Sequence, residues 1–159
     1  DDLIDKLTER ALAEVESRHP QAPDAERRDV ARRIAVGALR YFLLKFTRTS
    51  VIAFDLQEAL SFEGETGPYV QYAALRAANI LRKAEGAGLI PPATLPATNT
   101  PVFGQYLLQE EPLWQLILTA ARRDLVIERA IAAGDPATVA KYAFQLAQSF
   151  NSFYHDYPV

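Results

Sequence analysis

Apolar residues recur at the spacing of a helix through nearly the whole chain. In the first such segment, about residues 3–19, leucine and valine stand three to five positions apart, and a proline follows. The second segment, about residues 24–46, is acidic and rich in arginine in its first half and apolar in its second half. Because apolar residues at this period form one stripe along a helix, both segments are predicted to be helices that bury this stripe.

Start and stop signals divide the rest of the chain into further helices. Asp24, Asp55 and Pro68 are predicted to begin helices, because aspartate caps a helix N-terminus and proline favours the first helical position. Gly86 and Gly134 are predicted to end helices. Beyond residue 46, the predicted helices cover about residues 56–62, 68–85, 112–122, 124–134 and 136–154.

Few segments depart from the helical period. Residues 49–54 favour a strand, but this stretch is short and isolated. Residues 90–101 are rich in proline and threonine and are predicted to form a loop or linker. The pattern as a whole therefore predicts an all-α fold, a bundle of helices.

The composition is that of an ordinary folded domain. Hydrophobic residues make up 49% and charged residues 23% of the 159, a balance that excludes a wholly disordered chain. The chain has no cysteine, which excludes disulfides, thiolate metal sites and a cysteine nucleophile. The net charge is -3, so we expect any RNA binding to use a local surface rather than bulk positive charge.

The chain carries no sign of a membrane or secretory segment. No apolar run reaches the roughly 18 residues that suggest a membrane span, and the acidic N-terminus differs from a basic secretory signal. No membrane partner is expected. Because the chain starts with Asp1, contains no methionine and ends on the apolar residues 157–159, we expect it to be a fragment of a longer protein.

One face of the helix after Pro68 combines aromatic and basic residues. Tyr69, Tyr72, Arg76 and Lys83 fall within roughly a quarter turn of that helix, together with an asparagine. Tyrosine can stack on unpaired bases, and arginine and lysine can meet phosphates. The alternative is that both tyrosines are half-buried against a neighbouring helix, with their hydroxyl groups hydrogen-bonded at its edge. For the arginines of residues 27–40, the sequence likewise allows two interpretations, a solvated surface or contacts to phosphates.

The sequence predicts no catalytic or metal site. His19 and His155 are far apart and have no convergent acidic motif, which makes a poor metal site. Glu63 and Glu65 flank a glycine, and a solvated loop explains them better than an acid/base pair. Residues 64–67 lack the spacing and the lysine of a phosphate-binding loop.

Three segments in the same order resemble class I arginyl-tRNA synthetases. Residues 62–73, Phe-Glu-Gly-Glu-Thr-Gly-Pro-Tyr-Val-Gln-Tyr-Ala, resemble a signature of that family, and residues 37–42 resemble its Gly-Ala-x-(Lys/Arg)-Tyr segment. Residues 142–154 are similar to its Tyr-Leu-x-x-Leu-Ala-x-x-Phe-Asn-x-Phe-Tyr helix, and Pro158-Val159 matches the Pro-Val that follows. The chain departs from the family pattern at Glu65, where asparagine or aspartate is usual, and at Ala74, which replaces a histidine.

The resemblance implies a domain organisation and a role. Residues 1–62 would be a helical segment that follows an absent catalytic Rossmann domain, and residues 63–159 an anticodon-binding helical bundle truncated at its C-terminus. The whole enzyme would attach arginine to its tRNA with ATP and magnesium. Motifs of the His-Ile-Gly-His and Lys-Met-Ser-Lys types do not occur here. We therefore expect this segment to hold no cofactor and to be inactive alone.

By the same resemblance, the implied partners are tRNA(Arg) and the upstream catalytic domain of the same chain, in the cytoplasm. The loop at residues 63–68 and the start of the next helix would lie near the anticodon loop. The predicted tRNA-binding residues are Gly64, Glu65, Thr66, Gly67, Tyr69, Tyr72, Arg76 and Lys83. The alternative is a helical scaffold or protein-interaction module without an RNA role.

Overall fold

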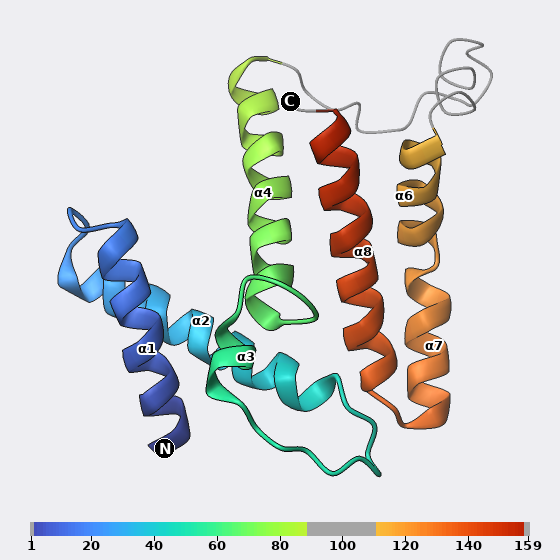
Figure 1. The fold of residues 1–159 in the computed structure, drawn as a ribbon. Helices are drawn as coiled ribbons and strands as arrows, with labels where there is room; N and C mark the ends of the chain where they lie inside the picture. The colour runs from blue at the N-terminus through green and yellow to red at the C-terminus, as the bar shows by residue number, and fades with distance from the viewer. Residues whose placement is uncertain (1, 89–110, 158–159) are drawn as a thin grey trace.

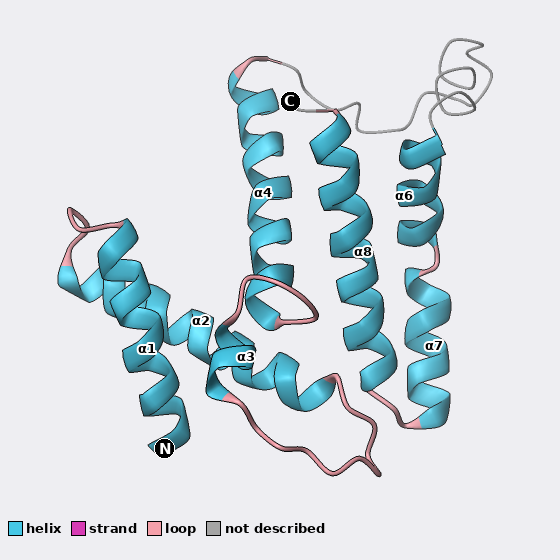
Figure 2. Ribbon diagram, viewed as in Figure 1, coloured by secondary structure: helices cyan, strands magenta, loops and turns pink. Residues whose placement is uncertain are grey.

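The computed structural model describes residues 2–88 and 111–157, and within these residues the chain forms helices and no strand (Figures 1 and 2). The predicted all-α class is therefore confirmed, and the β-prone stretch of residues 49–54 is a loop. The linker predicted at residues 90–101 lies outside the described residues. The helices are α1 (Asp2–Arg18), α2 (Asp24–Leu44), α3 (Leu56–Leu60), α4 (Gly67–Gly86), α6 (Glu111–Ala121), α7 (Arg123–Ala133) and α8 (Ala137–Asp156).

The helices form two groups that share α2. In the first group, α1 packs along α2, and α3 lies against both. In the second, α4, α8 and the consecutive pair α6 and α7 stand side by side, with α8 in the middle (Figure 1). Because α2 packs against α1 and also against α4 and α8, it joins the groups. The domain boundary expected between residues 62 and 63 falls in the loop before α4 and stays a prediction.

The core of the first group is built on one leucine and one phenylalanine. Leu7 is fully buried and Phe42 is 2% exposed. The Phe42 ring meets those of Phe46 and Phe54 edge-on, with centroids 5.5 and 4.7 Å apart, an arrangement that aromatic pairs prefer. Most other buried apolar residues are alanines, which let the helix backbones approach closely.

Gly67 allows α4 to start directly against α2. A Cβ atom added to Gly67 would lie 2.8 Å from the Gly37 carbonyl oxygen and 2.9 Å from Ala38 Cα. A Cβ atom added to Gly37 would lie 2.1 Å from the Gln71 side-chain nitrogen. The contact at Gly67 is with backbone atoms and is closer than a Cβ atom tolerates, whereas the Gln71 side chain could turn away from Gly37. The close approach at Gly67 therefore sets where the loop before α4 and the first turns of α4 lie.

We expect the substitution Gly67→Ala to destabilise the fold by at least about 1 kcal/mol, because backbone atoms of α2 would have to move. Gly86→Ala is the matched control, since Gly86 also lies in α4 and a Cβ atom there meets nothing within 4 Å. Urea unfolding followed by circular dichroism measures both. Equal midpoints for the two variants would contradict the close crossing.

Local signals placed most helix ends correctly. Asp55 caps α3 by accepting hydrogen bonds from the backbone nitrogens of Gln57 and Glu58, and these bonds lower the pKa of its carboxyl group. Gly134 ends α7 in the left-handed conformation, at a φ of 58°. The prediction that Asp24 caps α2 was wrong, because Pro23 is the cap residue and Asp24 lies within the first turn. There its negative charge still faces the positive end of the helix dipole.

Candidate nucleic-acid interface

Arg76 is the centre of a side-chain cluster between α4 and α8. Its Nη1 atom donates to Asn151 Oδ1 at 3.0 Å, and its Nη2 atom donates to the Tyr72 hydroxyl at 2.5 Å. The guanidinium carbon lies 4.5 Å from the Tyr72 ring centroid and 4.8 Å from that of Tyr154. We call these four residues the Arg76 cluster. Hydrogen bonds and cation–π contacts hold the guanidinium between two aromatic rings, so the rings are positioned before any ligand arrives.

The two tyrosines of α4 lie in different surroundings. Tyr69 is half-buried, and its ring packs against Phe144 of α8 with centroids 5.3 Å apart. For Tyr69, this is the packing against a neighbouring helix that was named above as the alternative to RNA contact. Tyr72 is 48% exposed, so part of its ring is available to a partner. Both residues remain predicted tRNA contacts, and Tyr72 is the one whose surface is open.

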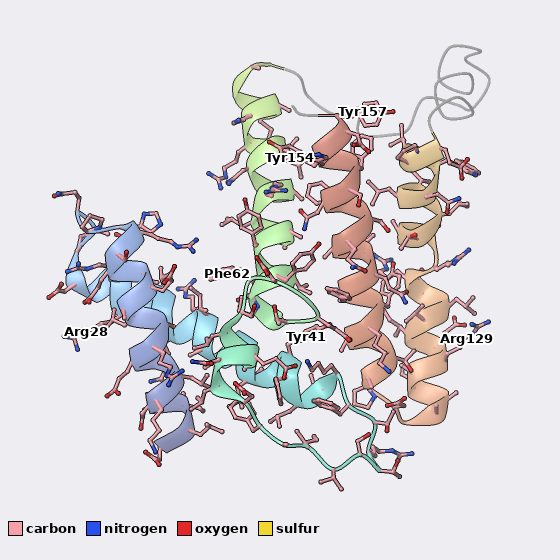
Figure 3. All side chains as sticks on the ribbon, viewed as in Figure 1. Arg28, Tyr41, Phe62, Arg129, Tyr154 and Tyr157 are labelled. Carbon is pink, nitrogen blue, oxygen red and sulfur yellow. The ribbon has the colours of Figure 1, made fainter. Side chains whose placement is uncertain are left out.

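A hollow of about 220 Å³ lies beside the Arg76 cluster along α4. Tyr72, Arg76 and Tyr154 line it, and Asn79 and the exposed Lys83 continue the lining along α4. Lys83 carries a positive charge in the last turn of α4. The hollow therefore combines two aromatic rings with two cations, a combination that suits an unpaired nucleotide. Figure 3 shows Tyr154 at the α4 side of α8.

The loop before α4 is held by its own polar groups. Thr66 is buried, and its hydroxyl group donates to the Ser61 carbonyl at 2.6 Å and accepts from the Tyr69 backbone nitrogen at 3.3 Å. Gly64 has a φ of 78°, which favours glycine. The predicted contacts at Thr66 and Gly67 are thus buried residues that shape the loop, whereas Gly64 is exposed.

Glu65 links this loop to α2. Its backbone oxygen accepts from Lys45 Nζ at 3.2 Å, and Lys45 also pairs with Glu58 at 2.6 Å. Burial and the nearby Glu65 carboxylate raise the pKa of the Tyr41 hydroxyl, which donates to the Ala140 carbonyl at 3.1 Å. The labelled Tyr41 in Figure 3 lies between the loop and α8. Glu65 is therefore half-buried among structural contacts, although it stays a predicted tRNA contact.

Asn151 and Tyr154 were not among the residues predicted from the sequence to contact tRNA. They are three positions apart on α8, which places them on one face of that helix. Both fall within the segment of residues 142–154 that carries the family resemblance, and this was the signal that could have identified them.

The described residues contain no group of three or more histidine, cysteine, aspartate or glutamate side chains that could hold a metal ion. Within the same part of the chain, every helix is too short or too polar to cross a membrane. Among the arginines of α2, Arg27 pairs with Asp24 and Arg33 pairs with Asp29. Arg32, Arg33 and Arg40 are exposed and line one hollow. The choice between a solvated surface and phosphate contacts therefore stays open for these arginines.

The chain matches a family model and known proteins along its sequence. The family model of the DALR anticodon binding domain matches residues 70–159. The arginine–tRNA ligase of Streptococcus uberis is 40% identical over 151 residues, which cover 95% of this chain and 24% of the relative. That of Pyrococcus furiosus is 35% identical over 161 residues, which cover 100% of this chain and 25% of the relative. This chain therefore spans about a quarter of the length of these relatives.

Two solved structures are similar over almost the whole chain. The arginyl-tRNA synthetase of Thermus thermophilus has a TM-score of 0.78 and 35% identity, and the match covers 97% of this chain and 24% of that one. The arginyl-tRNA synthetase of Plasmodium falciparum has a TM-score of 0.73 at 22% identity, covering 98% of this chain and 26% of that one, a likeness of fold.

Proposed function

This chain belongs to the DALR anticodon-binding domain family, and we propose that it is the tRNA-binding part of an arginine–tRNA ligase, where it contacts the anticodon loop of tRNA(Arg). The relatives that match it along its length are arginine–tRNA ligases. The attachment of arginine with ATP and magnesium would belong to a catalytic domain joined to this segment. Such an enzyme would work in the cytoplasm.

The observation that carries the proposal is the Arg76 cluster. Anticodon bases are unpaired, so their flat faces can stack on aromatic rings. Tyr72 offers an exposed ring, and Arg76 holds it through a hydrogen bond and a cation–π contact. A ring held in advance loses little conformational entropy when a base stacks on it.

The charge distribution supports local recognition rather than general affinity for RNA. At a net charge of -3 the chain gains little from bulk phosphate neutralisation. Arg76 and Lys83 place positive charge at the hollow itself. Binding should therefore depend on an RNA loop that fits this hollow. A helical scaffold without an RNA role is the alternative, in which the Arg76 cluster would serve only to join α4 to α8.

Binding of the 159-residue chain to two transcripts tests the proposal. One is tRNA(Arg), and the other is the same tRNA without its anticodon stem and loop. We expect the shortened transcript to bind at least about tenfold more weakly, because it loses the unpaired bases and each stacked base is worth about 1–3 kcal/mol. Equal affinities would contradict anticodon recognition. No binding of either transcript would favour the scaffold.

A further inference from the structure

A second concave surface, the α1–α4 groove, lies between α1 and α4 and has a volume of about 610 Å³. Phe62, which precedes the loop before α4, stands in this groove with its side chain 40% exposed (Figure 3). Tyr72 and Leu75 form the α4 wall, and they are 48% and 56% exposed. Three large apolar side chains left open on one concave surface indicate a site that a partner covers.

The opposite wall of the groove carries two arginines. Arg10 and Arg18 line it, together with His19 and one acidic residue, Glu14. Arg10 also lies near Asp55 and helps to lower the pKa of that carboxyl group. Arg18 pairs with Glu14 at 2.6 Å, and its guanidinium carbon lies 5.1 Å from the Phe62 ring centroid. The Arg18 side chain is 58% exposed, so it can turn toward a ligand and keep its apolar stem in place. The Phe62 ring can stack on a base, and the arginines beside it can bind the phosphate of the same nucleotide.

The groove continues the hollow of the Arg76 cluster. Tyr72 and Leu75 line both surfaces, so the groove and the hollow adjoin along α4. A protein segment could also cover exposed apolar residues. The arginines and the shared Tyr72 favour RNA, because the same polynucleotide chain can occupy both surfaces.

We propose that the α1–α4 groove binds a further unpaired nucleotide of the RNA loop that contacts Tyr72. The base stacks on Phe62, and the phosphate on the α1 side of this base is bound by Arg18 and Arg10. This inference rests on the proposed RNA-binding function and extends the interface to α1. Phe62 was not among the residues predicted to bind tRNA.

The first test substitutes Phe62→Leu, which keeps an apolar side chain and removes the flat ring. Affinity for fluorescently labelled tRNA(Arg) transcript is measured on the 159-residue chain. We expect binding to weaken about fivefold or more, the equivalent of the roughly 1 kcal/mol at the lower end of base stacking. Trp114→Leu is the matched control, because Trp114 is 37% exposed but lies on α6, and it should leave affinity unchanged.

The second test addresses the arginines of the opposite wall and does not depend on Phe62. Arg18→Gln is compared with Arg129→Gln, whose side chain is exposed on α7 on the far side of the bundle (Figure 3). Loss of a phosphate contact should lower the slope of log affinity against log salt by about 0.7 in the first variant and leave it unchanged in the second. If Phe62→Leu lowers the melting temperature, its weaker binding could come from unfolding. The salt dependence of Arg18→Gln then decides whether the groove binds RNA.

The Tyr72→Ala variant separates this inference from the proposed function. Weaker binding in Tyr72→Ala, Phe62→Leu and Arg18→Gln supports the groove as part of the interface. If Tyr72→Ala weakens binding while Phe62→Leu and Arg18→Gln bind as the unsubstituted chain does, the inference is overturned and the proposed function stands. The groove would then be a surface for protein. If the unsubstituted chain fails to bind tRNA(Arg), both proposals fall.

Discussion

Replacement of Tyr72 by alanine is expected to weaken tRNA(Arg) binding by about 1–3 kcal/mol, or roughly fivefold to more than a hundredfold. The ring is 48% exposed beside the hollow, so a base can stack on it. The substitution also removes the hydroxyl group that accepts from Arg76 and the ring over which the guanidinium lies. Equilibrium titration of labelled tRNA against the chain measures the loss.

Tyr69→Ala is the informative comparison, because Tyr69 belongs to the same helix face but packs against Phe144. We expect Tyr69→Ala to lower the melting temperature, whereas Tyr72→Ala should change it little. Tyr72→Phe keeps the ring and should lose less affinity than Tyr72→Ala. The prediction is wrong if Tyr72→Ala lowers the melting temperature while its folded fraction binds tRNA normally. Tyr72 would then be a packing residue.

The largest effect on stability is expected from Phe42→Ala. Phe42 is 2% exposed in the core shared by α1, α2 and α3, and its ring contacts those of Phe46 and Phe54. Truncation removes these contacts and leaves a cavity, which costs about 3–5 kcal/mol for a buried phenylalanine. Since folded domains are stable by only about 5–15 kcal/mol, a large part of the total stability would be lost.

Leu43→Ala is the control for this prediction, because Leu43 is the next residue of α2 and is 47% exposed. Its free energy of unfolding should fall by about 0.5 kcal/mol or less. Urea titration of the helical circular dichroism signal compares the two variants. Similar losses for Phe42→Ala and Leu43→Ala would show that α2 does not bury the face described.

Much of the fold could be predicted from local signals. The helical period along α1, α2, α4 and α8 depends on residues three and four positions apart, and these are neighbours before any tertiary contact forms. The cap at Asp55 and the stop at Gly134 act through backbone groups of their own turn. The cap expected at Asp24 failed for a local reason as well, since Pro23 already occupied the cap position.

The candidate site was predictable only in part. The spacing after Pro68 correctly grouped Tyr72, Arg76 and Lys83 beside one hollow. Helical spacing fixes the direction in which a side chain points from the axis of its helix. It contains no information on which other helix lies in that direction. From the sequence, Tyr69 and Tyr72 were therefore predicted to have equivalent surroundings. In the structure, Tyr69 packs against Phe144, whereas Tyr72 is exposed.

Tertiary packing decided the remaining features of the site. Arg76 meets Asn151 only because α8 lies along α4, although 75 residues separate them in the chain. The groove at Phe62 likewise exists because α1 and α4 both pack against α2 and leave a space between them. Contacts of this kind depend on how helices cross, and the close approach of Gly67 to Gly37 sets one such crossing, that of α4 and α2. No pattern within a single helix encodes that crossing, because it results from the fit between two surfaces.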